Sequence, residues 1–304
     1  MQHLLTLFEL SANDVTAILD RASALKSAMQ SGAREPICSG LVMTQVFEKP
    51  SLRTRVSFDA AMSQLGGQSI FLTGKEAGLE GRESNEDIAR VLGGYSDVIV
   101  LRTFAQSLIE LFAAHSGCHV INGLSDAYHP CQALTDLLTI RESRGSLSGL
   151  KLAYVGDGNN VARSLAIACA LSGMTFTIAA PKGYELDAEF VEKLGTTYPG
   201  VTLEQHNDPC AAVDGADAVY TDVWASMGQE AEKDERARTF ASYQVDTKLL
   251  DAAGEDVIFM HCLPARRGQE VSAEVMEDRR SLVFEQAENR MHLAKGLIAW
   301  LLGR

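Results

Sequence analysis

The chain alternates short apolar segments with amphipathic helical patterns, and this alternation constrains the fold more than any other feature of the sequence. Strands that are separated by crossover helices pair in parallel and are covered by helices on both faces. The pattern therefore predicts an α/β protein with two domains, each a mostly parallel sheet flanked by helices. The expected strands are 41–47, 69–72, 97–101, 118–121, 151–155, 175–179, 201–205, 217–221 and 257–260. The first expected helix opens at a cap over 11–14 and runs to about residue 30. The other expected helices are 53–65, 84–94, 106–116, 131–144, 160–172, 187–195 and 287–302.

The length of 304 residues exceeds the size at which one hydrophobic core usually stops growing, so we expect two domains. The stretch Arg144-Gly145-Ser146-Leu147-Ser148-Gly149 is the most linker-like part of the chain. We place the first domain over 1–144 and the second over 145–286, and we expect the last helix, within 287–304, to pack back on the first domain.

The composition of the chain indicates which partners it can bind and where in the cell it is expected. The net charge of −13 argues against a nucleic acid or an anionic membrane as partner. Six cysteines are scattered without paired spacing, which is typical of reduced thiols, and no metal-ligand spacing occurs. The sequence begins without a signal-peptide pattern and contains no run of about 18 apolar residues. We therefore expect a soluble, cytoplasmic protein.

Cations and hydroxyls are concentrated in Ser51-Leu52-Arg53-Thr54-Arg55, between one predicted strand and the next helix. The start of a helix offers unpaired N–H groups and the positive end of a dipole to an anion. The fork of an arginine fits the paired oxygens of a phosphate, and Ser51 or Thr54 can add a hydroxyl donor. The segment predicts a phosphate site; the alternative is an N-cap serine followed by surface arginines.

Polar residues also follow other strands, where ligands bind in open α/β sheets. Arg102 follows one strand, and His129-Pro130-Cys131-Gln132 lies a short loop beyond the next. Pro130 fits the first helical position, which places His129 and Gln132 together at a helix start. The imidazole could donate to a carbonyl oxygen while Gln132 holds an adjacent amide. A capping histidine beside a buried glutamine is the alternative.

The turn Gly156-Asp157-Gly158-Asn159-Asn160 superficially matches a dinucleotide fingerprint. Val161 replaces the third glycine of that fingerprint, and the next strand ends without an acidic residue for a ribose hydroxyl. We therefore do not predict a nicotinamide cofactor. An asparagine at this turn either caps the helix or binds a carboxylate or amine of a substrate.

Two further motifs lie beyond the last strands of the second domain. In the segment 222–228, Asp222 could pair with an ammonium, and the small residues that follow are typical of a substrate lid or of an ordinary turn. In the segment 261–264, Cys262 is a nucleophile, a group that orients or deprotonates an amine, or simply a buried thiol. Neighbouring residues of an extended chain point to opposite sides, so His261 and Cys262 are poorly placed to pair.

Together these motifs resemble the aspartate/ornithine carbamoyltransferase family over nearly the whole chain, and Ser226-Met227-Gly228 is similar to the ornithine-specific branch. Leu52 stands where the family usually has threonine, at a position contacted largely through its backbone. Gly78 and Glu80 lie where ornithine-specific members commonly have a glutamine-glycine pair that reaches a neighbouring subunit. The matching segments, in family order, are 47–55, 129–132, 156–160, 222–228, 261–264 and 287–290.

The resemblance implies transfer of the carbamoyl group of carbamoyl phosphate to the side-chain amine of L-ornithine, giving L-citrulline and phosphate. The implied carbamoyl-phosphate residues are Ser51, Leu52, Arg53, Thr54, Arg102, His129, Gln132, the backbone of Cys262 and Leu263, and Arg290. The implied ornithine residues are Asn160, Asp222, Ser226 and Met227, with Cys262 near the reacting amine. The expected catalytic residues are Arg102, His129 and Cys262. No cofactor or metal is implied, and the family is typically a homotrimer or a multiple of trimers.

Two other functions compete with this one. A different acceptor, such as an N-acylated ornithine or putrescine, would need another loop in place of Ser226-Met227-Gly228, so Asp222 with this loop favours free ornithine. A catalytically silent relative that only binds a ligand or a partner protein would be expected to lack one of the arginines, His129 or Cys262. All of them are present.

Overall fold

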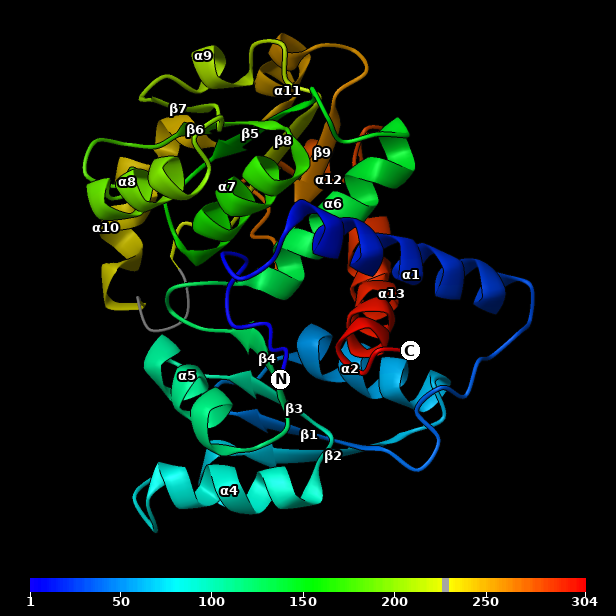
Figure 1. Ribbon diagram of the computed structural model, residues 1–304. Coiled ribbons are helices and arrows are strands. Elements are labelled where there is room, and N and C mark those ends of the chain that lie inside the picture. Colours follow the sequence, from blue (N-terminus) through cyan, green and yellow to red (C-terminus); the bar gives the residue numbers. More distant parts are fainter. Residues whose placement is uncertain (226–229) are drawn as a thin grey trace. The chain divides into compact units, whose positions relative to one another are not determined.

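The computed structural model describes residues 1–225 and 230–304, and the chain divides into two compact units. Unit 1 comprises Met1–Leu138 and Glu288–Arg304, and unit 2 comprises Thr139–Ala287. The first division lies within helix α6 (Pro130–Arg144), a few residues before the linker-like stretch, and the second lies within helix α13 (Val283–Leu301). Each unit contains one parallel sheet flanked by helices, which confirms the predicted fold class (Figure 1).

Unit 1 is built on a four-stranded sheet in the order β2-β1-β3-β4. Its elements before α6 are α1 (Ala12–Gln30), β1 (Val42–Phe47), α2 (Leu52–Gln64), β2 (Gln68–Thr73), α3 (Gly74–Ala77), α4 (Asn85–Tyr95), β3 (Val98–Arg102), α5 (Gln106–His115) and β4 (His119–Leu124). Val46, Leu101 and Val120 pack against α4 and α5 in one buried cluster. Gln45 points to the other face and donates to Asp59 of α2 at 2.6 Å. Helices therefore cover both faces, as expected for a parallel sheet.

The C-terminal helix α13 packs closely against α1 within unit 1. A Cβ atom on Gly296 would lie 2.6 Å from the backbone nitrogen of Ala22, so only glycine permits this approach. Lys26 of α1 donates to Asn289 of α13 at 2.8 Å. Helix α13 begins at Val283 rather than near residue 287 as the periodicity predicted. This packing fixes Arg290 within unit 1.

Unit 2 is built on a five-stranded parallel sheet in the order β7-β6-β5-β8-β9. Its elements between α6 and α13 are β5 (Lys151–Val155), α7 (Asn160–Ser172), β6 (Thr175–Ala179), α8 (Ala188–Thr197), β7 (Leu203–His206), α9 (Pro209–Val213), β8 (Ala218–Thr221), η1 (Glu230–Glu232), α10 (Lys233–Thr239), η2 (Ala241–Tyr243), α11 (Thr247–Ala253), β9 (Ile258–His261) and α12 (Ala273–Met276). Tyr154 and Tyr220 stack across β5 and β8 with ring centroids 5.8 Å apart. The carboxyl ends of β5, β8 and β9 are consequently neighbours at one edge.

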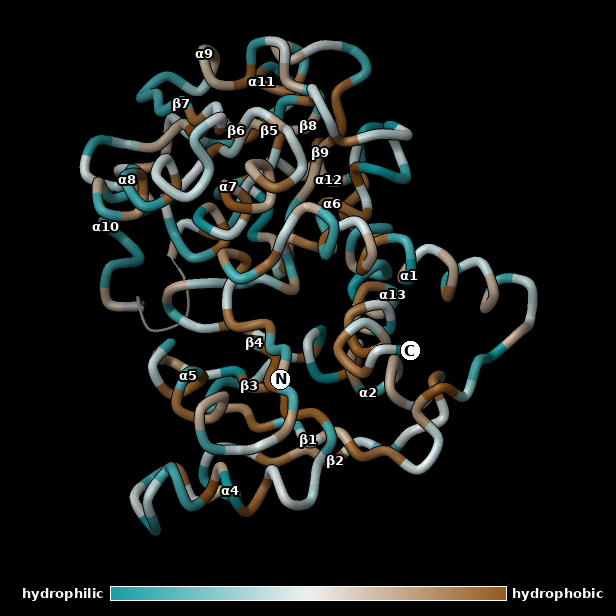
Figure 2. Tube along the Cα trace, in the orientation of Figure 1, coloured by the Kyte–Doolittle hydropathy of each residue, from teal (hydrophilic) through white to brown (hydrophobic). Residues whose placement is uncertain are grey.

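Hydropathy follows this layering in each unit. Hydrophobic residues run along the inner strands, whereas hydrophilic ones are more frequent on outer helices such as α4 and α8 (Figure 2). Strand β3 shows the extreme case, since all five of its residues are buried. Among the described residues, no helix is both long enough and apolar enough to cross a bilayer.

Candidate functional site

In unit 1, the predicted phosphate segment forms the start of α2. Ser51 is the N-cap, and its Oγ accepts a hydrogen bond from the backbone nitrogen of Thr54 at 3.3 Å. The Ser51 hydroxyl also donates to Thr54 Oγ1 at 3.0 Å. The first turn carries no acidic residue, so the positive helix end is not neutralised locally. The side chain of Leu52 is 75% exposed, which leaves its backbone as the part that faces the helix start.

The two arginines of this segment have different surroundings. Arg55 lies over the ring of Phe71, with its guanidinium carbon 3.7 Å from the ring centroid, and its Nε is 3.7 Å from Asp59. Arg53 is half-buried and lies close enough to His129 to lower the pKa of that imidazole. Arg53 thus belongs to the candidate site, whereas Arg55 makes a cation–π contact on the neighbouring strand.

Three arginines from distant parts of the sequence surround His129 in unit 1. Burial lowers the pKa of His129 well below its usual value, and the charges of Arg290, Arg102 and Arg53 lower it further. Arg102 ends β3 and is 8% exposed, while Arg290 of α13 is 4% exposed. The Nη2 atom of Arg290 is buried and has no hydrogen-bond partner among the described residues. A neutral imidazole and three permanent cations in one place form a strong anion site in an acidic protein.

Gln132 and Cys131 follow His129 at the start of α6. The amide nitrogen of Gln132 donates to Asp136 at 2.8 Å, and both side chains are buried. This contact directs the Gln132 carbonyl oxygen to accept from another group, such as an amide NH₂. Cys131 donates to the carbonyl of Asn122 at 3.3 Å, and burial raises the pKa of its thiol to about 11. Cys131 is therefore a packed, unreactive thiol.

In unit 2, Asp222 lies at the carboxyl end of β8 and is 6% exposed. One carboxylate oxygen accepts from Asn159 at 3.1 Å, and the other accepts from the backbone nitrogen of Val223 at 2.8 Å. The thiol of Cys262, just beyond β9, donates to the same second oxygen at 3.1 Å. These residues form a compact polar cluster that presents a fixed carboxylate next to a thiol.

The two asparagines at the start of α7 occupy different positions. Asn159 is the N-cap, and its Oδ1 accepts from the backbone nitrogens of Val161 and Ala162 at 2.9 and 3.1 Å. Asn160, which the family resemblance assigns to the substrate, is the first helical residue and is half-buried. The sequence motif contained Asn159, but only the fold shows that its amide also contacts Asp222.

The glycines of this turn have a structural explanation that does not involve a dinucleotide. A Cβ atom on Gly158 would lie 2.6 Å from the carbonyl carbon of Glu185, and the Gly158 nitrogen donates to the carbonyl of Tyr184 at 2.7 Å. Gly158 is therefore required because the loop after β6 approaches its backbone.

Asp222, His261 and Cys262 each offer a potential metal ligand, and these atoms all lie within 4.8 Å of one another. His261 Nδ1, however, accepts from the backbone nitrogen of Leu263 at 2.9 Å, and its Nε2 lies 3.2 Å from Glu270. Both imidazole nitrogens are thus engaged by other groups. We assign no metal to this cluster.

Ser226 and Met227, the remaining predicted ornithine residues, lie outside the described residues. The charged stretch after them forms η1 and α10, which the sequence did not predict as helical. Arg236 of α10 bonds the carbonyl of Trp224 at 3.0 Å and Asp157 at 2.6 Å. Burial raises the pKa of Asp157, and Arg236 opposes this effect. Sequence reasoning missed this ion pair because its partners are far apart in the chain.

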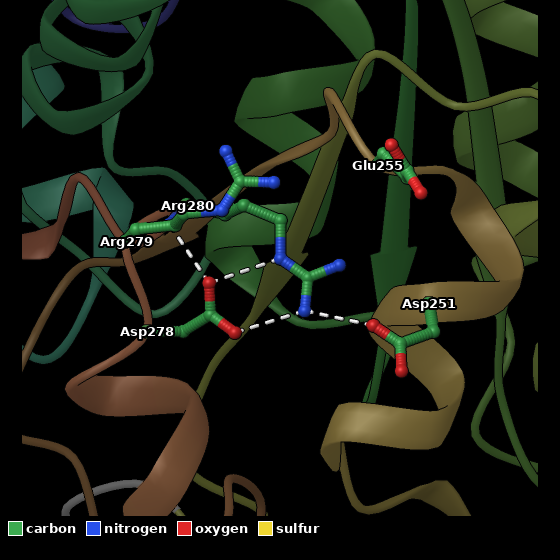
Figure 3. Close-up of a pocket in the computed structure, with 5 residues that line it drawn as sticks. All are labelled: Asp251, Glu255, Asp278, Arg279 and Arg280. Carbon is green, nitrogen blue, oxygen red and sulfur yellow. Dashed lines mark hydrogen bonds and ion pairs between the residues drawn. The ribbon is translucent and has the colours of Figure 1, made fainter.

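A separate pocket of about 760 Å³ lies on unit 2 and contains none of the predicted site residues. Arg280 bridges Asp278 and Asp251, each at 2.8 Å, so its charge is already balanced by carboxylates (Figure 3). Hydrogen bonding to Arg280 lowers the pKa of Asp278 to about 2. We interpret the residues around this pocket as a surface ion-pair network, because Arg280 is already paired with two carboxylates. The remaining residues that line it are Glu255 and Arg279.

Comparison with known proteins gives a consistent family. Residues 2–142 match the family description "Aspartate/ornithine carbamoyltransferase, carbamoyl-P binding domain", and residues 148–301 match "Aspartate/ornithine carbamoyltransferase, Asp/Orn binding domain". The chain is 49% identical to an ornithine carbamoyltransferase of Bacillus subtilis over 98% of this chain and 93% of that protein. It is 47% identical to one of Carboxydothermus hydrogenoformans, over 98% and 97%. A solved ornithine carbamoyltransferase of Pyrococcus furiosus has a TM-score of 0.96 and 43% identity, covering 99% and 97% of the two chains.

Proposed function

Because the chain belongs to the aspartate/ornithine carbamoyltransferase family, we propose that it transfers the carbamoyl group of carbamoyl phosphate to the side-chain amine of L-ornithine. The products are L-citrulline and phosphate. The observation that carries the proposal is the neutral His129 among three arginines beside the start of α2. This arrangement combines permanent positive charge for a phosphate with an uncharged donor for a carbonyl oxygen.

In this proposal the residues of unit 1 bind carbamoyl phosphate. Arg53, the hydroxyls of Ser51 and Thr54 and the backbone at Leu52 bind the phosphate, and the helix start adds its free N–H groups. Arg102, Arg290 and His129 bind the bridging and carbonyl oxygens. Gln132 accepts from the carbamoyl NH₂, because its own amide nitrogen is engaged by Asp136. The family resemblance further implies the backbone of Cys262 and Leu263, which belong to unit 2, as acceptors for this NH₂ group.

Ornithine is bound in this proposal by residues of unit 2. Asp222 pairs with the α-ammonium group, and Asn160 contacts the amino-acid backbone of the substrate. Ser226 and Met227 complete the amino-acid contacts, as the family resemblance implies. Cys262 lies near the side-chain amine, where its thiol, held 3.1 Å from Asp222, orients the attacking nitrogen.

The chemical step needs no group beyond these residues. The uncharged side-chain amine attacks the carbamoyl carbon, a C–N bond forms, the C–O bond to phosphate breaks, and the departing phosphate takes up the proton that the nitrogen loses. The carbonyl oxygen gains negative charge in the transition state, so the preorganised donors Arg102 and His129 contribute most there. The arginines also stabilise the departing phosphate. Arg102, His129 and Cys262 are therefore the proposed catalytic residues.

Assembly and location complete the proposal. We expect a homotrimer or a multiple of trimers, as the family resemblance implies. Exposed apolar side chains on α2, Leu52 at 75% and Val56 at 53%, support an interface near the phosphate segment. Six free cysteines fit a reducing, cytoplasmic location.

The test supplies carbamoyl phosphate together with a panel of amines and measures carbamoylated product and released phosphate. L-Ornithine should give citrulline and phosphate in equal amounts, with turnover well above that of N-acetylornithine or putrescine. If either of those amines has a higher kcat/KM than L-ornithine, that amine, and not ornithine, is the acceptor. Binding of carbamoyl phosphate without turnover of any amine would make the protein a silent relative.

A further inference from the structure

A fully buried histidine and glutamate lie directly behind the Cys262 turn in unit 2. His261 ends β9, Glu270 lies in the loop before α12, and the side chains of both are 0% exposed. The His261 Nε2 and Glu270 Oε1 atoms are 3.2 Å apart. The same carboxylate oxygen accepts from the backbone nitrogen of Arg266 at 2.5 Å. None of the roles assigned above uses this pair.

The hydrogen bonds define the tautomer of His261. The backbone nitrogen of Leu263 can only donate, and it lies 2.9 Å from Nδ1, so Nδ1 must be the unprotonated acceptor. The ring proton is therefore on Nε2 and is donated to Glu270. A chain of contacts thus leads from Glu270 through His261 to the backbone of Leu263.

That backbone has a conformation that needs external support. Leu263 has φ of 58°, and it is the one non-glycine residue with positive φ in the described part of the chain. A left-handed conformation is unfavourable for a leucine and persists where surrounding contacts determine it. The turn that contains Leu263 also carries Cys262, whose thiol lies 3.1 Å from Asp222. Its backbone conformation consequently sets the distance between the thiol and the carboxylate.

The burial of this pair is also unfavourable for stability. Glu270 Oε2 is buried and has no hydrogen-bond partner among the described residues. An incompletely bonded buried carboxylate is unfavourable for stability, and an apolar pair of similar volume would satisfy packing alone. The directional contacts of His261 and Glu270 therefore explain this buried pair better than a gain in stability does.

We propose that His261 and Glu270 are positioning residues that hold the Cys262–Leu263 turn in register with Asp222 for attack by the acceptor amine. The inference rests on the proposed function, because it concerns the amine half of that site. Glu270 fixes the ring, the ring fixes the Leu263 nitrogen, and the turn then fixes the thiol. Neither residue needs to touch a substrate.

Two substitutions of His261 distinguish an effect on the position of the turn from an effect on the stability of the protein. The side-chain oxygen of asparagine falls near Nδ1 of histidine, so His261→Asn keeps the acceptor for Leu263 and loses the contact with Glu270. The amide of glutamine falls near Nε2, so His261→Gln keeps the contact with Glu270 and loses the acceptor. Each variant loses one buried hydrogen bond, so their Tm values should fall by similar amounts.

Their kinetics should differ. We expect His261→Asn to keep kcat/KM for ornithine within about tenfold of the wild type, and His261→Gln to lose about 100-fold, since small misplacements of a reacting group have effects of that size. The Kd for inorganic phosphate should be unchanged in both, because the cationic cluster belongs to unit 1. Equal kcat/KM values, or the reverse order, would overturn the proposal.

A second pair of variants covers the case in which the histidine variants do not fold. Glu270→Gln retains an oxygen that can accept from both Arg266 and His261 and should keep at least about a tenth of kcat/KM. Glu270→Leu removes the acceptor for both groups at once, whereas His261→Asn leaves the Arg266 contact intact, so Glu270→Leu should lose about 100-fold. Equal activity of these two variants would also overturn the positioning role. If the wild-type protein forms no citrulline in the same assay, the proposed function itself is wrong, and this outcome is distinct from equal activity among active variants.

Discussion

The two units present polar clusters of opposite character at the carboxyl ends of similar sheets. In unit 1, arginines from β3, α2 and α13 surround a buried histidine, and their charges lower the pKa of that histidine. In unit 2, a carboxylate at the end of β8 contacts an asparagine and a thiol. The first cluster suits a phosphate ester and the second suits an ammonium. One parallel-sheet architecture can thus serve substrates of opposite charge, because the residues after each strand, rather than the sheet, determine the chemistry.

Among the changes considered, replacement of Arg53 in the cationic cluster of unit 1 should reduce activity most. Arg53→Ala removes a permanent cation from the helix start, and we expect kcat/KM for carbamoyl phosphate to fall by about 1,000-fold or more, in line with the loss of a charged contact to a transferring group. Arg55→Ala is the matched control, because Arg55 contacts Phe71 and Asp59, and it should remain within a few-fold of wild type. The measurements are steady-state kinetics and the Kd of inorganic phosphate. Unchanged phosphate affinity in Arg53→Ala would remove this residue from the phosphate site.

Replacement of Asp222 tests the polar cluster of unit 2. Asp222→Asn keeps the shape and the acceptor for Val223 but removes the charge, so kcat/KM for ornithine should fall by about 100-fold, as when one partner of a buried charge pair is lost. The Kd for phosphate should stay at the wild-type value. Glu204→Gln, an exposed carboxylate on β7, is the control and should leave both quantities unchanged. A loss of phosphate affinity in Asp222→Asn would show that the two clusters are not separable.

The pH dependence distinguishes the ionisation of the substrate from that of the protein. Because burial and three guanidinium groups lower the pKa of His129, its imidazole is neutral at and above pH 6.5 and contributes no change there. The ornithine side-chain amine titrates near ~10, so kcat/KM for ornithine should rise by up to about tenfold per pH unit between pH 7 and 9. A profile of rate against pH measures this. A flat profile, or an inflection near 6.5 that disappears in His129→Asn, would contradict the assignment.

A smaller effect concerns the packing that holds Arg290 in the cationic cluster. Lys295 of α13 is 2% exposed and donates to Gln64 at 3.2 Å, and burial lowers its pKa to about 8. Between pH 8 and the unfolded value near 10.5, the unfolded chain binds more protons at this site, so the free energy of unfolding should rise with pH. The rise from this group is at most about 1.4 kcal/mol per pH unit. Chemical denaturation of wild type and Lys295→Met from pH 7.5 to 9.5 measures the difference, which should be absent if Lys295 titrates normally.

The sequence predicted the buried strands and the long helices of the fold well and the short helices poorly. The bounds of β5, α7 and β6 agree with the structure, because buried strands and a long helix with an asparagine cap and a following glycine carry clear local signals. The helices α3, α9, α11 and α12 were not predicted. They span four to seven residues, too few for a periodic pattern, and tertiary packing stabilises them.

The candidate site was predictable where its residues lie within one motif. Ser51, Arg53 and Thr54 lie in one helical turn, and the N-cap bond of Ser51 follows from local geometry. The contacts of Glu270 with His261 and of Arg236 with Asp157 were not predicted, because the partners lie 9 and 79 residues apart in the chain and share no motif. Asp136 had a local signal that was overlooked, since it lies one helical turn after Gln132.

The sequence by itself determined the alternating architecture, the family and the identity of the chemical groups, because these depend on local periodicity and on residues in fixed order. The tertiary structure decided which of those groups act together. Only the folded chain brings Arg290 of the last helix near His129 and turns Arg55 onto Phe71. The physical reason is that burial and proximity set the strength of electrostatic interactions, and both depend on residues distant in sequence.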